Sequence, residues 1–158
     1  MADRSRRRPK LVDAIPPGAS LLIDSSVVLA YLGGGEAGSS RAEELFDAFV
    51  ATGRNPASIS TVTVAEILVR PFRRGPAAVA TAEGFLQHFA DIGLVPITYE
   101  VAREGARLRA ATELPMPVAL ILASAVVAGA DLVVTADRSW RTRLRDIAPE
   151  IEVVQLTA

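Results

Sequence analysis

One stretch near the start of the chain, SLLIDSSVVLAYL at Ser20–Leu32, most constrains the fold. Leu21, Leu22 and Ile23 form a short apolar run that Asp24 ends, and apolar residues then resume at helical spacing. This pattern is typical of a buried strand followed by a helix. Asp24 would lie at the carboxyl end of a central parallel strand, where open α/β sheets bind their ligands. An aspartate at such a place also commonly forms an Asx turn or caps the next helix, so both roles stay open.

The rest of the chain continues this alternation of strands and helices. Helices are expected over Ser39–Ala51, Thr63–Arg74, Pro76–Ala90, Tyr99–Ala111, Val118–Ala128 and Ser139–Asp146, and strands over Ala57–Thr61, Leu94–Ile97, Asp131–Thr135 and Glu152–Gln155. The helix that begins at Val118 is apolar on all sides, which predicts that it is buried. Short turns between alternating strands and helices predict a single α/β domain with a five-stranded parallel sheet flanked by helices.

Charge and composition narrow the class of protein. The net charge is −1, but residues 1–10 hold five basic side chains against Asp3, which leaves the remainder acidic. We expect a basic, flexible arm over residues 1–18, either solvated or in contact with nucleic acid, and a folded domain over residues 19–158. No apolar run is long enough to span a membrane, and no apolar segment follows the N-terminal charges as in a secretory signal. Together with the absence of cysteine, this predicts a cytoplasmic protein without a membrane partner.

Two further acids follow predicted strands. Glu66 comes after the second strand and Asp137 directly after the fourth. Because the carboxyl ends of parallel strands share one edge of a sheet, Asp24, Glu66 and Asp137 are predicted to face one cleft. Carboxylates at close range repel unless a hard cation neutralises them, and oxygen ligands favour Mg²⁺ or Mn²⁺ over zinc. Such a cation can activate water and hold a phosphate during hydrolysis.

Each of these acids has a structural alternative. Thr63 and Glu66 have the spacing of a capping box, and Asp137 is placed to cap the helix that follows it. Ser25 and Thr135 lie next to the predicted carboxylates. They can assist a water molecule or the cation there, or serve as ordinary turn residues. No glycine-rich phosphate loop follows the first strand, which disfavours a nucleotide cofactor.

Three motifs in this order resemble the successive motifs of PIN-domain proteins. They are IDSSVV at Ile23–Val28, AEIL at Ala65–Leu68, and TAD at Thr135–Asp137 before an aromatic residue at Trp140. The chain is most similar to the VapC-type ribonuclease toxins of toxin–antitoxin pairs, over about Ser20–Leu156. The resemblance implies a five-stranded parallel sheet, an acidic site for a divalent metal, an RNA substrate and an antitoxin partner.

One motif departs from the family pattern. The family usually has an acid at the start of the long buried helix, where this chain reads LPMPVALILASA over Leu114–Ala125. Val118 stands at the place of that acid. Glu113 is nearby but precedes the Pro-x-Pro break, so the sequence does not assign it as a substitute. The departure weakens the assignment of an activity more than the assignment of the fold.

Two functions therefore stay open. The first is a Mg²⁺-dependent (or Mn²⁺-dependent) endoribonuclease in which Asp24 and Asp137 bind the metal, Glu66 completes the shell directly or through water, and Val118 weakens the activity. The second is a catalytically inactive PIN domain that binds RNA or a protein. Two groups of arginines can hold RNA phosphates or an acidic partner segment, or be solvated. They are Arg70, Arg73 and Arg74 after Glu66, and Arg138 and Arg141 after Asp137.

The apolar residues of Val118–Ala128 and Ser39–Ala51 exceed what one small sheet needs to cover it. Together with the family resemblance, this predicts a homodimer with a groove that receives an antitoxin segment.

Overall fold

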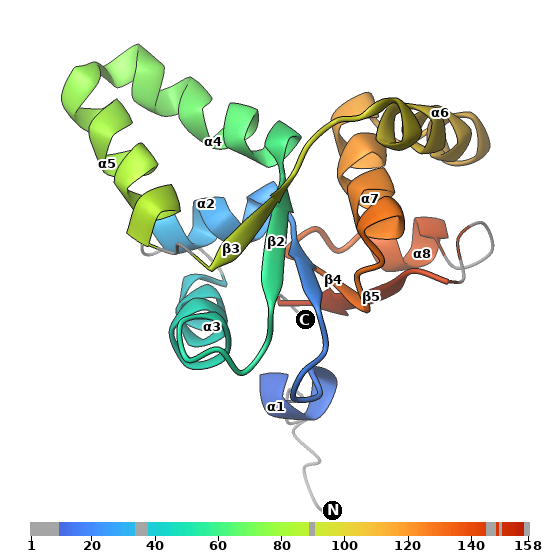
Figure 1. Cartoon of the computed structure of the whole chain (residues 1–158), viewed down its shortest axis with the longest axis horizontal. Coiled ribbons are helices and arrows are strands. Elements are labelled where there is room, and N and C mark those ends of the chain that lie inside the picture. The colour runs from blue at the N-terminus through green and yellow to red at the C-terminus, as the bar shows by residue number, and fades with distance from the viewer. Residues whose placement is uncertain (1–9, 34–37, 89–90, 145–147, 149, 157–158) are drawn as a thin grey trace, which may run out of the picture.

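The fold is built on a parallel sheet whose central strand is the first one in the chain. The computed structural model describes residues 10–33, 38–88, 91–144, 148 and 150–156. The strands are β1 (Leu21–Ile23), β2 (Ala57–Ser60), β3 (Ile92–Val95), β4 (Leu132–Thr135) and β5 (Glu152–Gln155). They pair in the order β3-β2-β1-β4-β5, and every pairing is parallel (Figure 1). After β1 the chain adds β2 and β3 on one side of this strand and then β4 and β5 on the other. The topological switch point therefore lies between β1 and β4.

Helices cover both faces of this sheet. They are α1 (Leu11–Ala14), α2 (Ser25–Gly33), α3 (Ser39–Glu44) with the π-helical turn η1 (Leu45–Val50), α4 (Thr61–Arg74), α5 (Pro76–His88), α6 (Tyr99–Thr112), α7 (Met116–Ala128) and α8 (Trp140–Leu144). Figure 1 shows α4 and α5 extending on one side of the sheet and α6 and α7 on the other. The predicted α/β domain with a five-stranded parallel sheet is confirmed.

Two hydrophobic cores lie on the two faces of the sheet. Leu21 and Ile23 of β1 belong to one core, which α2, η1, α4 and α5 cover, whereas Leu22 belongs to the other, beneath α6, α7 and α8. This split follows from the two-residue period of a strand, which sends successive side chains to opposite faces. All three residues of β1 are buried, and Asp24 follows them directly, so it lies at the carboxyl end of the central strand.

The folded domain begins earlier than predicted. Leu11 and Ile15 are buried in the core that includes Leu21, although they fall inside the arm predicted over residues 1–18. The buried Asn55 side chain fixes the segment that follows α1, since its Nδ2 donates to the carbonyl oxygens of Pro16 at 2.8 Å and Ala19 at 2.9 Å. The predicted flexibility of residues 1–9 concerns a part of the chain outside the described residues.

The apolar surface behind the homodimer prediction is covered within the chain. Leu45, Phe46, Phe49 and Val50 are buried in the first core, and the middle of α7, which includes Ile121 and Leu122, is buried in the second. Large apolar side chains are instead exposed elsewhere, among them Phe72 of α4, which is 68% exposed. The reason given for a homodimer is therefore wrong, although the homodimer itself stays a prediction.

Among the described residues, no helix combines the length and the apolar character that crossing a membrane requires.

Candidate functional site

A buried aspartate lies at the carboxyl end of the central strand, beside the switch point. Asp24 is only 4% exposed, and its backbone N–H donates to the carbonyl oxygen of Val134 on the neighbouring strand at 2.9 Å. Its Oδ2 atom accepts hydrogen bonds from Ser26 Oγ at 2.5 Å and from Thr135 Oγ1 at 2.9 Å. The predicted position of Asp24 at the edge of the sheet is confirmed.

The two hydroxyl groups that hold Asp24 are themselves held by backbone amides. The N–H of Ala136 donates to Ser26 Oγ at 3.0 Å, and the N–H of Asp137 donates to Thr135 Oγ1 at 3.0 Å. Each hydroxyl group therefore accepts one hydrogen bond and directs its single proton to Asp24 Oδ2. Thr135 thus links the side chain of one predicted site residue, Asp24, to the backbone of another, Asp137.

Sequence reasoning selected Ser25 beside Asp24 and missed Ser26. Ser25 Oγ lies 3.4 Å from Asp24 Oδ1, a longer contact than the bond from Ser26. Both residues open α2, and only the position of the backbone in the first helical turn decides which hydroxyl group reaches the carboxylate. The sequence does contain a signal for Ser26. A serine two residues after a strand-ending aspartate has the spacing of a local side-chain hydrogen bond.

The environment of Asp24 disfavours its charged form. Burial raises its pKa above the ordinary value of 3.8, and the hydrogen bonds from Ser26 and Thr135 lower it by less. The negative charge of Glu66 raises the pKa of Asp24 further. Two carboxyl groups within electrostatic reach of each other, one of them buried, form an arrangement that a cation stabilises.

Glu66 does not serve as a capping residue. Helix α4 begins at Thr61, two residues before the predicted start, and Ser60 is its N-cap, with Ser60 Oγ accepting from the Val62 N–H at 3.2 Å. The predicted capping box between Thr63 and Glu66 is therefore wrong, since both residues lie inside the helix. Glu66 Oε2 and Thr63 Oγ1 are buried atoms without a hydrogen-bond partner among the described residues.

Asp137, in contrast, holds the turn that leads into α8. Its Oδ1 atom accepts from the N–H of Ser139 at 2.8 Å, just before α8, and its side chain is exposed. The Gln155 side-chain amide also donates to the carbonyl oxygen of Asp137. The residues that the structure describes contain no group of three or more acidic or histidine side chains that can hold a metal ion. Asp24 and Glu66 therefore interact electrostatically, whereas the carboxyl group of Asp137 accepts a hydrogen bond in the turn before α8.

Val118 occupies the first turn of α7, two residues after the helix begins at Met116. Its side chain is half-buried and packs against the core beneath α6 and α7. The same helix contacts α4 through Ser124, whose Oγ donates to Ser60 Oγ at 3.0 Å and to the Leu120 carbonyl oxygen at 2.8 Å. Ser124 lies in the C-terminal half of α7, so this contact places that half of the helix, and not its first turn, at the N-terminal end of α4. The acid expected at position 118 is absent.

Arginines of α4 border a groove between α2, α4 and α5. This groove of about 390 Å³ is lined by Leu29, Leu32, Gly33, Ile67, Arg70, Pro71, Arg74, Ala78, Thr81 and Ala82. It combines an apolar floor with two cationic side chains, and Arg73 is exposed on the same helix. Arg138 is exposed after β4, whereas the side chain of Arg141 lies outside the described part of the structure.

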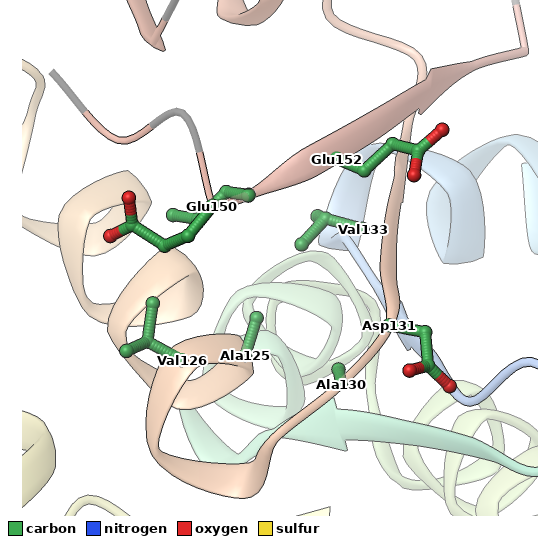
Figure 2. Close-up of a pocket in the computed structure, with 8 residues that line it drawn as sticks. Ala125, Val126, Ala130, Asp131, Val133, Glu150 and Glu152 are labelled. Atoms are coloured by element: carbon green, nitrogen blue, oxygen red, sulfur yellow. The ribbon is translucent and has the colours of Figure 1, made fainter.

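A second pocket lies at the opposite edge of the sheet. It is lined by residues that precede β4 and β5 and by the end of α7, and three of these residues are Asp131, Glu150 and Glu152. Their carboxyl groups point away from one another (Figure 2). Asp131 is already bound, since its Oδ2 accepts from the backbone N–H of Ser20 at 2.8 Å. This pocket is therefore a structural feature of the amino-end edge, separate from the Asp24 region.

The family model of the PIN domain matches residues 21–146. No curated protein matches the sequence significantly.

Several solved structures share the fold. A toxin–antitoxin complex from Klebsiella pneumoniae matches with a TM-score of 0.61 at 18% identity, over 86% of this chain and 97% of that one. VapBC2 from Rickettsia felis, bound to a DNA fragment from its promoter, matches with a TM-score of 0.62 at 14% identity, over 86% and 98% of the two chains. VapC20 from Mycobacterium tuberculosis, a toxin that cleaves the sarcin–ricin loop, matches with a TM-score of 0.58 at 16% identity, over 72% and 86%.

Proposed function

The chain belongs to the PIN domain family, and from this premise we propose that it is a VapC-type, metal-dependent endoribonuclease whose activity is limited by Val118. The observation that supports the proposal most is the pairing of Asp24 with Glu66 at the switch point of the sheet. Burial and the charge of Glu66 both raise the pKa of Asp24, and Glu66 keeps an unpartnered buried oxygen. Such a pair destabilises a core that has only a structural role, whereas a divalent cation bound to both carboxyl groups would offset their repulsion.

The residues present fit Mg²⁺ or Mn²⁺ through oxygen ligands alone. Asp24 Oδ2 is engaged by two hydroxyl groups, which leaves Oδ1, with only its long contact to Ser25, as the oxygen available to a cation. Glu66 would supply a carboxylate oxygen, and the backbone N–H of Asp137 holds the Thr135 hydroxyl group that donates to Asp24. A bound cation supplies Lewis acidity toward a phosphodiester and favours ionised water.

The side chains of this chain have their own roles in that reaction. Ser26 and Thr135 fix the Asp24 carboxyl group and prevent it from rotating, because both bonds converge on one oxygen. Arg138, exposed directly after Asp137, is placed to bind a phosphate beside the site, and Arg73 on α4 is a further exposed cation. The relative that cleaves the sarcin–ricin loop supports this class of activity for the fold.

The alternative, an inactive PIN domain that binds RNA or a protein, is favoured by one observation. Val118 replaces an acid, and the described residues contain no ready group of three acids for a metal. Cleavage of a labelled RNA, measured with Mn²⁺ and with EDTA, separates the two functions. Metal-dependent cleavage supports the enzyme, whereas salt-sensitive RNA binding without cleavage supports the binding module.

We further propose that the groove between α2, α4 and α5 receives a segment of an antitoxin. The apolar floor suits the apolar side of a peptide, and Arg70 and Arg74 suit carboxylates on its other side. The structural relatives that are toxin–antitoxin complexes support a partner of this kind. The homodimer also stays a prediction, for which exposed Phe72 of α4 is a candidate contact.

A charge placed in this groove is expected to abolish the complex. Ala78 lines the groove, so Ala78→Glu should weaken binding of a cognate antitoxin by about 100-fold, because a buried carboxylate would face the apolar segment. Ala77→Glu is the matched control, since Ala77 is exposed on the same helix and does not line the groove. Calorimetric titration measures both affinities. Equal affinities for the two variants would place the partner elsewhere.

A further inference from the structure

A threonine beside the candidate site has a hydroxyl group for which the protein itself provides no partner. Thr63 is fully buried, at 0% exposure, and its Oγ1 atom has no hydrogen-bond partner among the described residues. A buried hydroxyl group left unpaired destabilises a fold by about 1–3 kcal/mol. Such a group therefore indicates either a real cost in stability or a small polar ligand that satisfies it.

The position of Thr63 in its helix explains why its usual partner is missing. A threonine in a helix commonly donates to the carbonyl oxygen four residues earlier. Thr81 of α5 and Thr112 of α6 do so, at 3.0 Å to Ala77 and 2.6 Å to Leu108. Thr63 lies in the first turn of α4, so the residue four positions earlier, Ile59, belongs to strand β2. The hydroxyl group is thus left free by the junction between strand and helix.

A second unsatisfied oxygen lies on the same face of the same helix. Thr63 and Glu66 are three residues apart in α4, which places their side chains next to each other. Glu66 Oε2 is buried and has no partner among the described residues either. Glu66 in turn lies within electrostatic reach of Asp24. Two neighbouring side chains of α4 thus hold buried oxygen atoms without partners, and one of them interacts electrostatically with a buried carboxyl group, so this part of the helix needs a hydrogen-bond donor.

We propose that Thr63 is a positioning residue of the site: its hydroxyl group and Glu66 Oε2 together bind one water molecule, which fixes the Glu66 carboxyl group beside Asp24. A water molecule supplies two protons and two lone pairs, so it satisfies both atoms at once. The contribution of Thr63 to cation binding rests on the proposed function, whereas the bound water does not. Side chains that orient metal ligands in this way typically change metal affinity by 10–100-fold when they are replaced.

The test compares Thr63→Val, which keeps the shape and removes the hydroxyl group, with Thr63→Ser, which keeps the hydroxyl group. In EDTA, the unfolding midpoint of Thr63→Val should fall by about 2–4 °C, since a bonded hydroxyl group is lost. Calorimetric titration with Mn²⁺ should show an affinity at least about tenfold weaker for Thr63→Val. Thr63→Ser should restore most of the affinity. In a Glu66→Gln background in EDTA, Thr63→Val should lower the unfolding midpoint by little more, because the two residues share one water molecule.

The possible outcomes separate this inference from the proposed function. A midpoint that is unchanged or raised in Thr63→Val would overturn the bound water, because an apolar side chain replaces a truly unpaired hydroxyl group without loss. A lower midpoint with unchanged Mn²⁺ affinity would overturn the role of Thr63 in the site. If the parent protein binds no Mn²⁺, the proposed function fails, and the unfolding midpoints alone decide whether the water is bound.

Discussion

Asp24→Asn is expected to abolish binding of divalent cations and, at pH values above the raised pKa of Asp24, to make the protein more stable. Asp24 provides the most buried carboxyl group of the site, so its loss should weaken Mn²⁺ binding by about 100-fold or more and stop metal-dependent RNA cleavage. The stability gain arises because burial, the largest cause of its raised pKa, penalises the charged form of this carboxyl group. Removal of a strained functional charge commonly stabilises a fold.

The pH dependence of stability follows from the same pKa. Because the folded state holds the Asp24 proton more tightly than the unfolded state, this carboxyl group contributes stability below its ordinary pKa of 3.8. That contribution is lost as the pH rises through the raised pKa of the folded state. In EDTA, the parent protein should therefore lose stability over that range relative to Asp24→Asn.

Thermal unfolding in EDTA at a series of pH values measures this difference. Asp13→Asn in the exposed first turn of α1 is a matched control that removes a solvated carboxyl group. The control should follow the parent protein at every pH. A stability difference between Asp24→Asn and the parent that does not shift in favour of the variant as the pH rises would contradict the account, since it would mean that the bonds from Ser26 and Thr135 outweigh the effect of burial.

Val118→Asp is expected to strengthen Mn²⁺ binding by about tenfold or more and to raise metal-dependent cleavage. Val118 lies in the first turn of α7, where free backbone amides favour negative charge. An acid there adds an oxygen ligand and a charge, both of which a hard cation prefers. Without metal, the new half-buried charge should destabilise the protein, and Mn²⁺ should recover that stability.

The control for charge alone lies on the same helix. Val127→Asp introduces the same carboxylate near the other end of α7, at a side chain that is 45% exposed, and should leave Mn²⁺ binding unchanged. Asp24→Asn combined with Val118→Asp should abolish the gain. Equal affinity and equal cleavage with valine or aspartate at position 118 would show that this position does not belong to the site.

The sequence contains most of the information that determines the fold. The apolar run Leu21–Ile23 and the all-apolar helix at Val118–Ala128 predict buried elements because only burial satisfies such patterns. The early α1 was not predicted because its apolar residues form only a short run between the basic residues before Leu11 and the two prolines after Ile15. The π-helical turn η1 has no simple periodic signature, since its residues Leu45–Val50 read as an ordinary amphipathic helix.

The site was only partly predictable, for reasons that are local. Ser60, Thr61 and Thr63 are all residues that begin helices well, and only tertiary structure selects Ser60 as the cap and leaves Thr63 inside α4. Asp137 follows a strand just as Asp24 does, yet a turn directs its carboxyl group to the Ser139 amide. Spacing along the chain places a residue at the edge of the sheet, whereas the rotation of its side chain depends on contacts from other strands.

The central claim is that Asp24 and Glu66 form a site for a divalent cation, and calorimetric titration with Mn²⁺ tests it most directly. The parent protein should bind Mn²⁺ weakly at one site, and this binding should disappear in Asp24→Asn and in Glu66→Gln, both of which keep the size of the side chain. The Asp13→Asn control should bind as the parent does. Absence of binding in the parent protein, or binding that persists in either site variant, would contradict the claim.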